Sequence, residues 1–134
     1  MTWDGNGYSG RKILADFTIP GNPKPKERPR VVKGHTYTPK ATVLAETAVL
    51  DAFYDAYPFW SPVEHHIALG VIFYRETRVR ADLDNLVKTV QDALNKHAYV
   101  DDVQIVELVA AKHYAGKGNG RTLVRITDVK EGWT

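Results

Sequence analysis

The 134-residue sequence contains no cysteine, which excludes disulfide bonds and thiolate metal sites. It has no apolar run of the roughly 18 residues that a membrane-spanning helix needs, and no signal segment of charge followed by apolar residues. It also lacks the glycine-rich loop of nucleotide-binding enzymes, so kinases and ATPases are set aside. These absences predict a cytoplasmic protein without membrane association, and the length suits one domain over residues 1–134.

The formal net charge is only +2, but the charges are unevenly distributed. Acidic residues gather between positions 82 and 107, and basic residues flank them. This is expected where a metal ion occupies the acids and phosphates lie along the bases, although each basic group alone could be an ordinary solvated surface. Nucleic-acid binding is predicted for Lys24, Lys26, Arg28, Arg30, Lys33, Arg78, Arg80, Lys117 and Arg121.

The acids and one lysine are most concentrated at residues 80–88 (RADLDNLVK). Leucine and valine recur from there at helical spacing, which predicts an amphipathic helix from about Asp84. Asp84, Lys88 and Asp92 then share its polar face, one turn apart. Asp82 would precede the helix and Asp84 would lie at or next to its N-cap, where a carboxylate can accept bonds from free backbone N–H groups.

A second acidic pair, Asp101 and Asp102, opens the next apolar run, predicted as a strand over 103–114. A strand packing beside the helix could bring this pair to the acids of the helix start. Oxygen ligands without cysteine or a suitably spaced histidine pair favour a hard ion, Mg²⁺ or Mn²⁺. Lys88 would then meet charge that develops on a phosphate, and Asn85 could position a carboxylate or a water. The alternative is that these acids are ordinary helix caps and turn residues.

The acidic segments also carry a family resemblance. Residues 80–88, followed by Asp-Ala-Leu at 92–94 and Asp-Asp-Val-Gln-Ile at 101–105, resemble the signature of the RusA family of Holliday junction resolvases of bacteria and phages. The proline-rich segment 19–30 and Tyr-Thr-Pro at 37–39 resemble the opening segment of these proteins. The resemblance therefore covers most of the chain.

This resemblance implies a homodimeric, Mg²⁺-dependent endonuclease, with Mn²⁺ as a substitute, that nicks two strands of four-way junction DNA in recombination and repair. It places the catalytic, metal-binding aspartates at Asp82, Asp84 and Asp102, and the catalytic lysine at Lys88. Asp101 stays open as a ligand, because the length of the connection before this pair varies within the family.

The remaining segments predict an α+β fold: one domain with a mixed sheet and two main helices. Strands are expected at 13–19 and 65–75, and short strands flank a turn near Gly34. The last two strands are predicted to form a hairpin with residues 115–121 at its tip. That tip could reach into a junction or be a plain turn. Residues 1–10 are expected to be a loose end.

The first helix is predicted to begin at Thr38-Pro39, with Thr38 as N-cap. Its packing face is predicted as Val43, Leu44, Thr47, Leu50, Phe53, Tyr54 and Tyr57. The aromatic residues of 53–60 are assigned to a core or dimer contact rather than to base stacking. The proline-rich segment is interpreted as a stiff basic arm or as a surface linker.

Two other functions fit the same residues. The chain could bind DNA without cutting it, with the acids holding a structural ion or capping the helix. It could also be a nuclease for flaps, forks or single strands. A gel shift without nicking would identify the former, and comparison of branched substrates would identify the latter.

Overall fold

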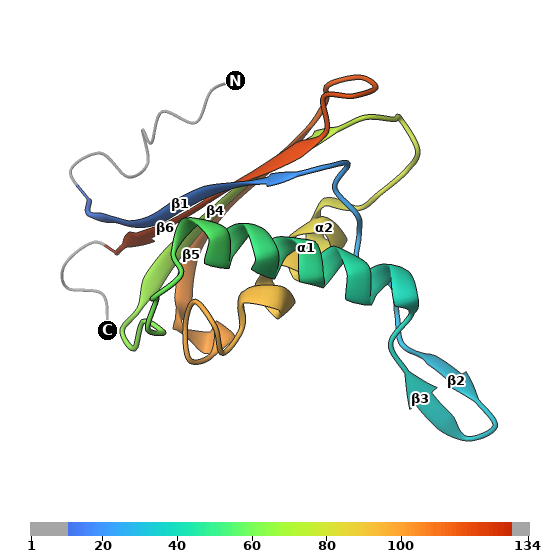
Figure 1. The fold of residues 1–134 in the computed structure, drawn as a ribbon, viewed down its shortest axis with the longest axis horizontal. Coiled ribbons are helices and arrows are strands. Elements are labelled where there is room, and N and C mark those ends of the chain that lie inside the picture. Colours follow the sequence, from blue (N-terminus) through green and yellow to red (C-terminus); the bar gives the residue numbers. More distant parts are fainter. Residues whose placement is uncertain (1–10, 130–134) are drawn as a thin grey trace.

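The computed structural model describes residues 11–129, so the predicted loose end at 1–10 lies outside the described residues. Four strands form the main sheet, in the order β1-β6-β4-β5: β1 (Ile13–Pro20), β4 (Ile67–Arg75), β5 (Ile105–Tyr114) and β6 (Arg121–Asp128). β4 and β5 are parallel and the other pairs are antiparallel. Two helices, α1 (Lys40–Ala56) and α2 (Leu83–Leu94), lie on one face of this sheet (Figure 1). The predicted α+β class with a mixed sheet and two helices is confirmed.

The core lies between this sheet face and the two helices. Alternate residues of β4 point toward the helices because successive strand side chains face opposite sides. The core includes Phe17, Val49, Phe53, Ile67, Leu69, Val71, Phe73, Leu86, Val90, Leu94 and Ile126. Each such side chain removed from water contributes about 1.5–3 kcal/mol, so this layer fixes where α2 lies on the sheet.

Helix α2 was predicted correctly. Leu86, Val90 and Leu94 are fully or almost fully buried, while Asp84 and Lys88 are exposed on the other side. The helical period determines both the apolar and the polar face of α2. When the apolar residues on one side are buried against the sheet, the charged residues at the intervening positions remain in solvent.

The predicted hairpin between the last two strands is wrong, because β4 lies between β5 and β6. Residues 115–120 cross the end of β4 instead, and the amides of Ala115 and Gly116 donate to the carbonyl of Arg75. β4 is apolar on both faces and is almost entirely buried. A buried strand needs a hydrogen-bonding neighbour along each edge, which β5 and β6 together supply. Arg121 is therefore the first residue of β6 rather than a residue of a hairpin tip.

The predicted packing face of α1 is partly wrong. Val43 and Leu44 are 48% and 60% exposed, whereas Thr42, Val49 and Phe53 are buried. Thr42 faces inward because its hydroxyl accepts a hydrogen bond from the backbone N–H of Glu27.

The start of α1 was misplaced by one residue, because its N-cap is Pro39 rather than Thr38. In the aromatic group, Phe53 packs on Tyr57 and Trp60, as the core assignment predicted. Phe59, in contrast, is 96% exposed.

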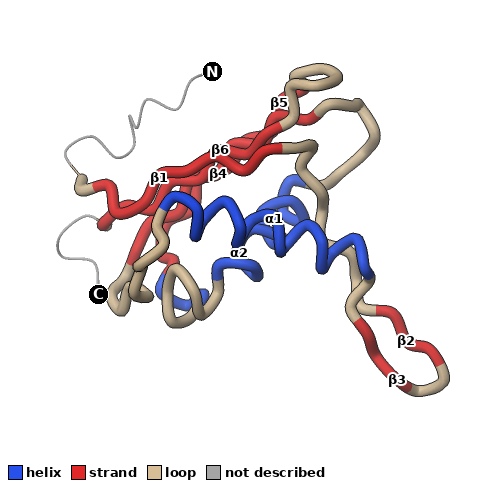
Figure 2. Tube along the Cα trace, viewed as in Figure 1, coloured by secondary structure: helices blue, strands red, loops and turns tan. Residues whose placement is uncertain are grey.

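A small hairpin, β2 (Arg30–Val32) and β3 (His35–Tyr37), projects from the main body (Figure 2). Lys33 and Gly34 form its turn with φ of 51° and 78°, the positive values that a tight hairpin turn needs. All six strand residues are exposed. An isolated two-stranded hairpin is marginally stable in water, so this element gains stability if another molecule covers it.

Candidate active site

The polar face of α2 presents a line of acids and one lysine. Asp82 is the N-cap residue by backbone geometry, but within residues 11–129 its side chain makes no capping hydrogen bond and is 58% exposed. Asp84 lies in the first turn, and its Oδ1 accepts from the N–H of Asn85 at 2.9 Å. Lys88 is one turn further and exposed. The N-cap residue is thus Asp82, whereas Asp84, which was expected at or next to the N-cap, lies in the first turn. The Asp82 carboxylate is accessible to a ligand.

The neighbouring acids Asp101 and Asp102 have different roles in the fold. Asp101 caps a short 3₁₀ turn, η2 (Asp102–Gln104): its carboxylate accepts from the N–H of Val103 at 3.1 Å. Gln104 completes this capping box by accepting from the N–H of Asp101 at 2.8 Å. The amide nitrogen of Gln104 donates to the carbonyls of Val63 and His65. Gln104 thus fixes the turn that carries both acids.

Asp102 is only partly satisfied. Its Oδ1 is buried and accepts no hydrogen bond from any residue between 11 and 129. Burial raises the pKa of its carboxyl group; the Tyr99 hydroxyl opposes this, while the charges of Asp92 and Asp101 raise the pKa further and Lys88 lowers it. The net pKa is raised. Two of the charges that act on its pKa, those of Asp92 and Lys88, belong to α2.

A second group of charges, centred on Lys26, is paired within the fold. The Lys26 ammonium lies 2.7 Å from Glu46 Oε2 and 3.0 Å from Asp92 Oδ2. Burial lowers the pKa of Lys26, but its bonds to Glu46 and Asp92 outweigh this effect and raise it. We call these three residues the closed cluster, and we call Asp82, Asp84, Lys88 and Asp102 the open cluster. Lys26, predicted to bind DNA, therefore joins the proline-rich segment to both helices.

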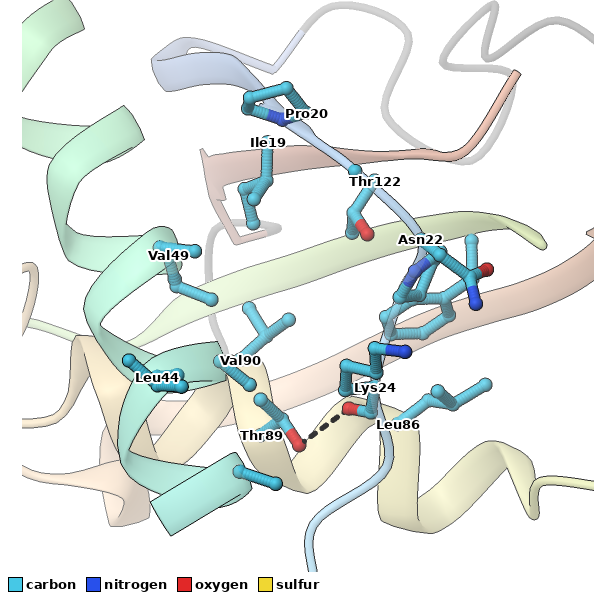
Figure 3. Close-up of a pocket in the computed structure, with 16 residues that line it drawn as sticks. Ile19, Pro20, Asn22, Lys24, Leu44, Val49, Leu86, Thr89, Val90 and Thr122 are labelled. Atoms are coloured by element: carbon cyan, nitrogen blue, oxygen red, sulfur yellow. Dashed lines mark hydrogen bonds between the residues drawn. The ribbon is translucent and has the colours of Figure 1, made fainter. Parts of the chain in front are cut away.

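The proline-rich segment is packed against α2. The N–H of Lys26 donates to the carbonyl of Asn85 at 2.9 Å, and the Thr89 hydroxyl donates to the carbonyl of Lys24 at 2.9 Å (Figure 3). The same segment lines one side of an apolar cavity of about 360 Å³ between α1 and α2. The Lys24 and Arg28 side chains stay exposed. The segment is thus neither a free arm nor a plain linker.

The other predicted DNA-binding residues fall in three places. Arg78 and Arg80 precede Asp82, and Arg80 Nε lies 3.9 Å from Asp82 Oδ1. Arg30 and Lys33 belong to the projecting hairpin, where Arg30 also pairs with Glu27 at 3.6 Å. Lys117 is exposed in the crossover loop, and the Arg121 guanidinium lies 4.0 Å from the Tyr74 ring centroid. Only the first pair directly adjoins the open cluster in sequence.

Sequence reasoning missed a second cavity, of about 240 Å³, beside Asp82. We call it the basic pocket, and its lining residues are Arg75, Thr77, Arg78, Val79, Arg80, Ala81, Lys112, His113 and Tyr114. Basic residues stand out in the sequence at several of these positions, but only the parallel pairing of β4 and β5 places Tyr114 opposite Arg75. Gln104 was also missed as a positioning residue, although Asp-x-x-Gln is a readable capping box.

The geometry of these acids limits how a metal ion could bind. Across residues 11–129, no three His, Asp or Glu side chains converge closely enough to hold a metal ion. Magnesium does not require such a cage, because it is typically bound by one or two carboxylates, several waters and a substrate phosphate. The buried, partnerless Oδ1 of Asp102 and the exposed carboxylate of Asp82 suit that kind of open site. Neither helix of the described chain is long and apolar enough to cross a membrane.

A model of the endodeoxyribonuclease RusA family matches residues 20–127. The uncharacterized protein YqaN of Bacillus subtilis is 41% identical over 46 residues, which cover 34% of this chain and 32% of YqaN. The chain thus matches about a third of the length of that relative. Since the family match extends from the end of β1 through α2 to the end of β6, this chain belongs to the RusA family of endodeoxyribonucleases.

Proposed function

We propose that the chain is a divalent-metal-dependent DNA endonuclease that resolves four-way junctions. The observation that carries the proposal is the open cluster: exposed carboxylates at the start of α2, together with Asp102, whose pKa is lowered by the charge of Lys88 and raised by burial. Carboxylates that are exposed or only partly satisfied within the fold, beside a basic surface, suit a bound cation and a phosphodiester. A bound Mg²⁺ supplies electrostatic stabilisation of phosphate oxygens and makes an attacking water more acidic.

Asp82, Asp84 and Asp102 would hold one or two Mg²⁺ ions, each bound by one or two of these carboxylates together with waters and a substrate phosphate, and Mn²⁺ would substitute for Mg²⁺. Asp102 is favoured over Asp101, because the Asp101 carboxylate already accepts the capping bond from Val103. The exposed ammonium of Lys88 would stabilise charge that develops on the phosphate during cutting. Asn85 would help to position a carboxylate or water.

Two copies of the chain would cut opposing strands of one junction. A two-fold dimer places two identical sites at a fixed separation, which matches the two equivalent strands. The projecting hairpin supports a contact between copies, since Val31 and Val32 are 68% and 50% exposed on a marginally stable element. Leu44, near the start of α1, is a further large apolar residue that is 60% exposed. Light scattering should give a dimer for the wild type and a monomer for a Val31→Asp, Leu44→Asp double variant.

The catalytic proposal is tested with a labelled four-way junction and Mg²⁺. We expect paired nicks on opposing arms from the wild type, and a loss of about 10²- to 10³-fold in Asp82→Asn, Asp84→Asn and Asp102→Asn, the scale for removing one electrostatic group from an active site. Asp101→Asn is the matched control: it should cut at nearly the wild-type rate. An intact junction with the wild type, or full activity in Asp84→Asn, would contradict the proposal.

A second function, DNA binding without cutting, is favoured by one observation. Within residues 11–129, no three His, Asp or Glu side chains lie close enough together to hold a metal ion. Such a protein would shift a junction in a gel under Mg²⁺ or Mn²⁺ without nicking it. Flaps, forks and single strands assayed under the same conditions would establish which branched DNA is preferred. The cytoplasmic location stays a prediction.

A further inference from the structure

The basic pocket lies at the end of the sheet where β4 and β5 finish. Four of its nine lining side chains, those of Arg75, Arg78, Arg80 and Lys112, carry a positive charge at neutral pH. The lining residues include neither Asp nor Glu. A concave site surrounded by cations on several sides concentrates positive potential, so its natural ligand is an anion.

Two of these cations, on β4 and β5, are incompletely paired. Arg75 is only 9% exposed; one of its terminal nitrogens donates to the carbonyl of Val79 at 3.1 Å. Its Nε is buried and has no hydrogen-bond partner among residues 11–129. The Lys112 ammonium donates to the carbonyl of Ala81 at 2.6 Å. No carboxylate of the described chain forms an ion pair with either residue.

A single carbonyl leaves most of the donors of each cation unused, because a guanidinium has five N–H groups and an ammonium three. Burying a cation without a counter-charge is costly, and proteins usually compensate for it with an anion. The fold keeps Arg75 buried on the central strand β4 nevertheless. This is the kind of local conflict that is expected where a ligand completes the site.

The rim of the pocket is preorganised. The Arg78 guanidinium lies 4.0 Å from the centroid of the Tyr114 ring, a cation–π contact that favours this position at the rim. Arg80 is 93% exposed at the side that leads to Asp82. Planar guanidinium groups bind phosphate through two parallel hydrogen bonds, a geometry that a lysine cannot reproduce.

We propose that the basic pocket binds one phosphate of a DNA strand, next to the phosphate that lies over the open cluster. Lys112 holds the carbonyl of Ala81, and Asp82 follows directly, so the pocket and the acids share one short stretch of backbone. A strand crossing this stretch would place consecutive phosphates at the acids and in the pocket. The assignment of the phosphate to DNA rests on the proposed function, whereas binding of phosphate itself does not.

The first experiment uses inorganic phosphate as the probe, with EDTA present. In NMR spectra of the full chain, the side-chain Nε–H signal of Arg75 should shift with increasing phosphate, and the Arg78→Gln, Lys112→Gln double variant should reduce that shift. The Lys12→Gln variant is the matched control: it removes one exposed positive charge next to β1, at the end of the sheet away from Arg75. Equal shifts in the double variant and in the control would overturn the proposal.

The second experiment measures junction binding against salt concentration, again in EDTA. Removing one cation that binds a phosphate reduces the slope of log affinity against log salt by about 0.9 on duplex or 0.7 on single strands. Arg78→Gln and Lys112→Gln should each lower the slope by up to that amount, and Lys12→Gln should leave it unchanged. Equal slopes in all three variants and the wild type would overturn the proposal.

A neutral methylphosphonate placed at one position of the junction sharpens the result. With the methylphosphonate at one position near the cut, the wild type should bind the junction more weakly than it binds the unmodified junction. Arg78→Gln should bind both junctions equally, because the two changes remove the same interaction. If no position gives this non-additivity, the pocket does not hold a DNA phosphate. All binding is measured without metal, so failure of the nuclease proposal appears only as an uncut junction and is distinguishable from failure here.

Discussion

The closed cluster and the open cluster contrast in how completely the fold satisfies their charges. In the closed cluster, the Lys26 ammonium is within 3.0 Å of two carboxylates, and the three side chains are 19–28% exposed. In the open cluster, Asp82 is 58% exposed and Asp102 has a buried oxygen without a partner in residues 11–129. Charges that are paired within the fold hold elements together. Charges left unsatisfied beside solvent are available to a ligand, so the two clusters should respond oppositely to substitution.

The largest contrast should be between the two lysines. Lys88→Gln should lower the cutting rate by about 10²- to 10³-fold, since one electrostatic contribution to the transition state is removed. Its stability should stay within about 0.5 kcal/mol, because Lys88 is exposed. Single-turnover cutting and urea unfolding measure the two effects. Lys96→Gln, another exposed lysine near the end of α2, is the control and should cut normally. A large loss of stability in Lys88→Gln would place it with the closed cluster.

Lys26→Met should show the opposite pattern in unfolding. The substitution leaves Glu46 and Asp92 half-buried without their shared cation, which should cost about 1–3 kcal/mol. Because Lys26 also links the proline-rich segment to both helices, hydrogen exchange should quicken at its own N–H, which donates to Asn85. Lys24→Met, at an exposed position of the same segment, is the control. Unchanged stability in Lys26→Met would show that its ion pairs contribute nothing.

The parts of the fold that could be predicted are those specified by neighbouring residues. The face of α2 follows from a local period. The turn near Gly34 follows from a glycine between two short strand segments, although it was expected around 34–35 and lies at Lys33 and Gly34. The loop between β5 and β6 does not reveal that both strands pair with β4 rather than with each other. That arrangement arises because β4, more than 30 residues earlier, needs a neighbouring strand along each edge. Glycines in the connecting loop favour a turn, but they do not specify which strands the turn joins.

The candidate site was predictable to a similar extent. The acids of α2 share a helix, so their grouping followed from their spacing. The difference between Asp101 and Asp102 depends on Gln104, whose amide reaches the carbonyls of Val63 and His65 in a distant segment. The inward face of α1 depends on Thr42 accepting a bond from Glu27, which no apolar pattern reveals.

Magnesium should stabilise the folded protein through the open cluster and not through the closed cluster. An ion that binds only the folded protein stabilises it by about 1.4 kcal/mol at ten times its Kd. The melting temperature of the wild type should therefore rise with added MgCl₂, and Lys26→Met should rise by the same amount from a lower starting value. Asp102→Asn should lose most of the increase and Asp101→Asn should keep it. Equal increases in these two aspartate variants would remove the distinction between ligand and cap.

The smallest effect concerns Asp102 in the metal-free protein. Its pKa in the fold is raised above the ordinary value of 3.8, chiefly by burial, so the folded state holds this proton more tightly than the unfolded chain. That stabilisation is present below the ordinary value and is lost as pH rises through the raised one. At neutral pH in EDTA, ionised Asp102 therefore destabilises the fold. Solvent screening keeps the effect to a few tenths of a kcal/mol, or about 1–3 °C in melting temperature.

Asp102→Asn should accordingly melt higher than the wild type at pH 7 in EDTA, and the difference should shrink as the pH is lowered toward 4. Asp101→Asn should melt lower at both pH values, because it weakens the cap on η2. A lower melting temperature for Asp102→Asn at pH 7 would mean that its carboxylate is satisfied within the fold. A higher melting temperature would instead show that the fold retains a carboxylate that is unfavourable in the absence of a cation. The neighbouring Asp101 shows the contrast, because its carboxylate at the same turn serves the fold as the cap of η2.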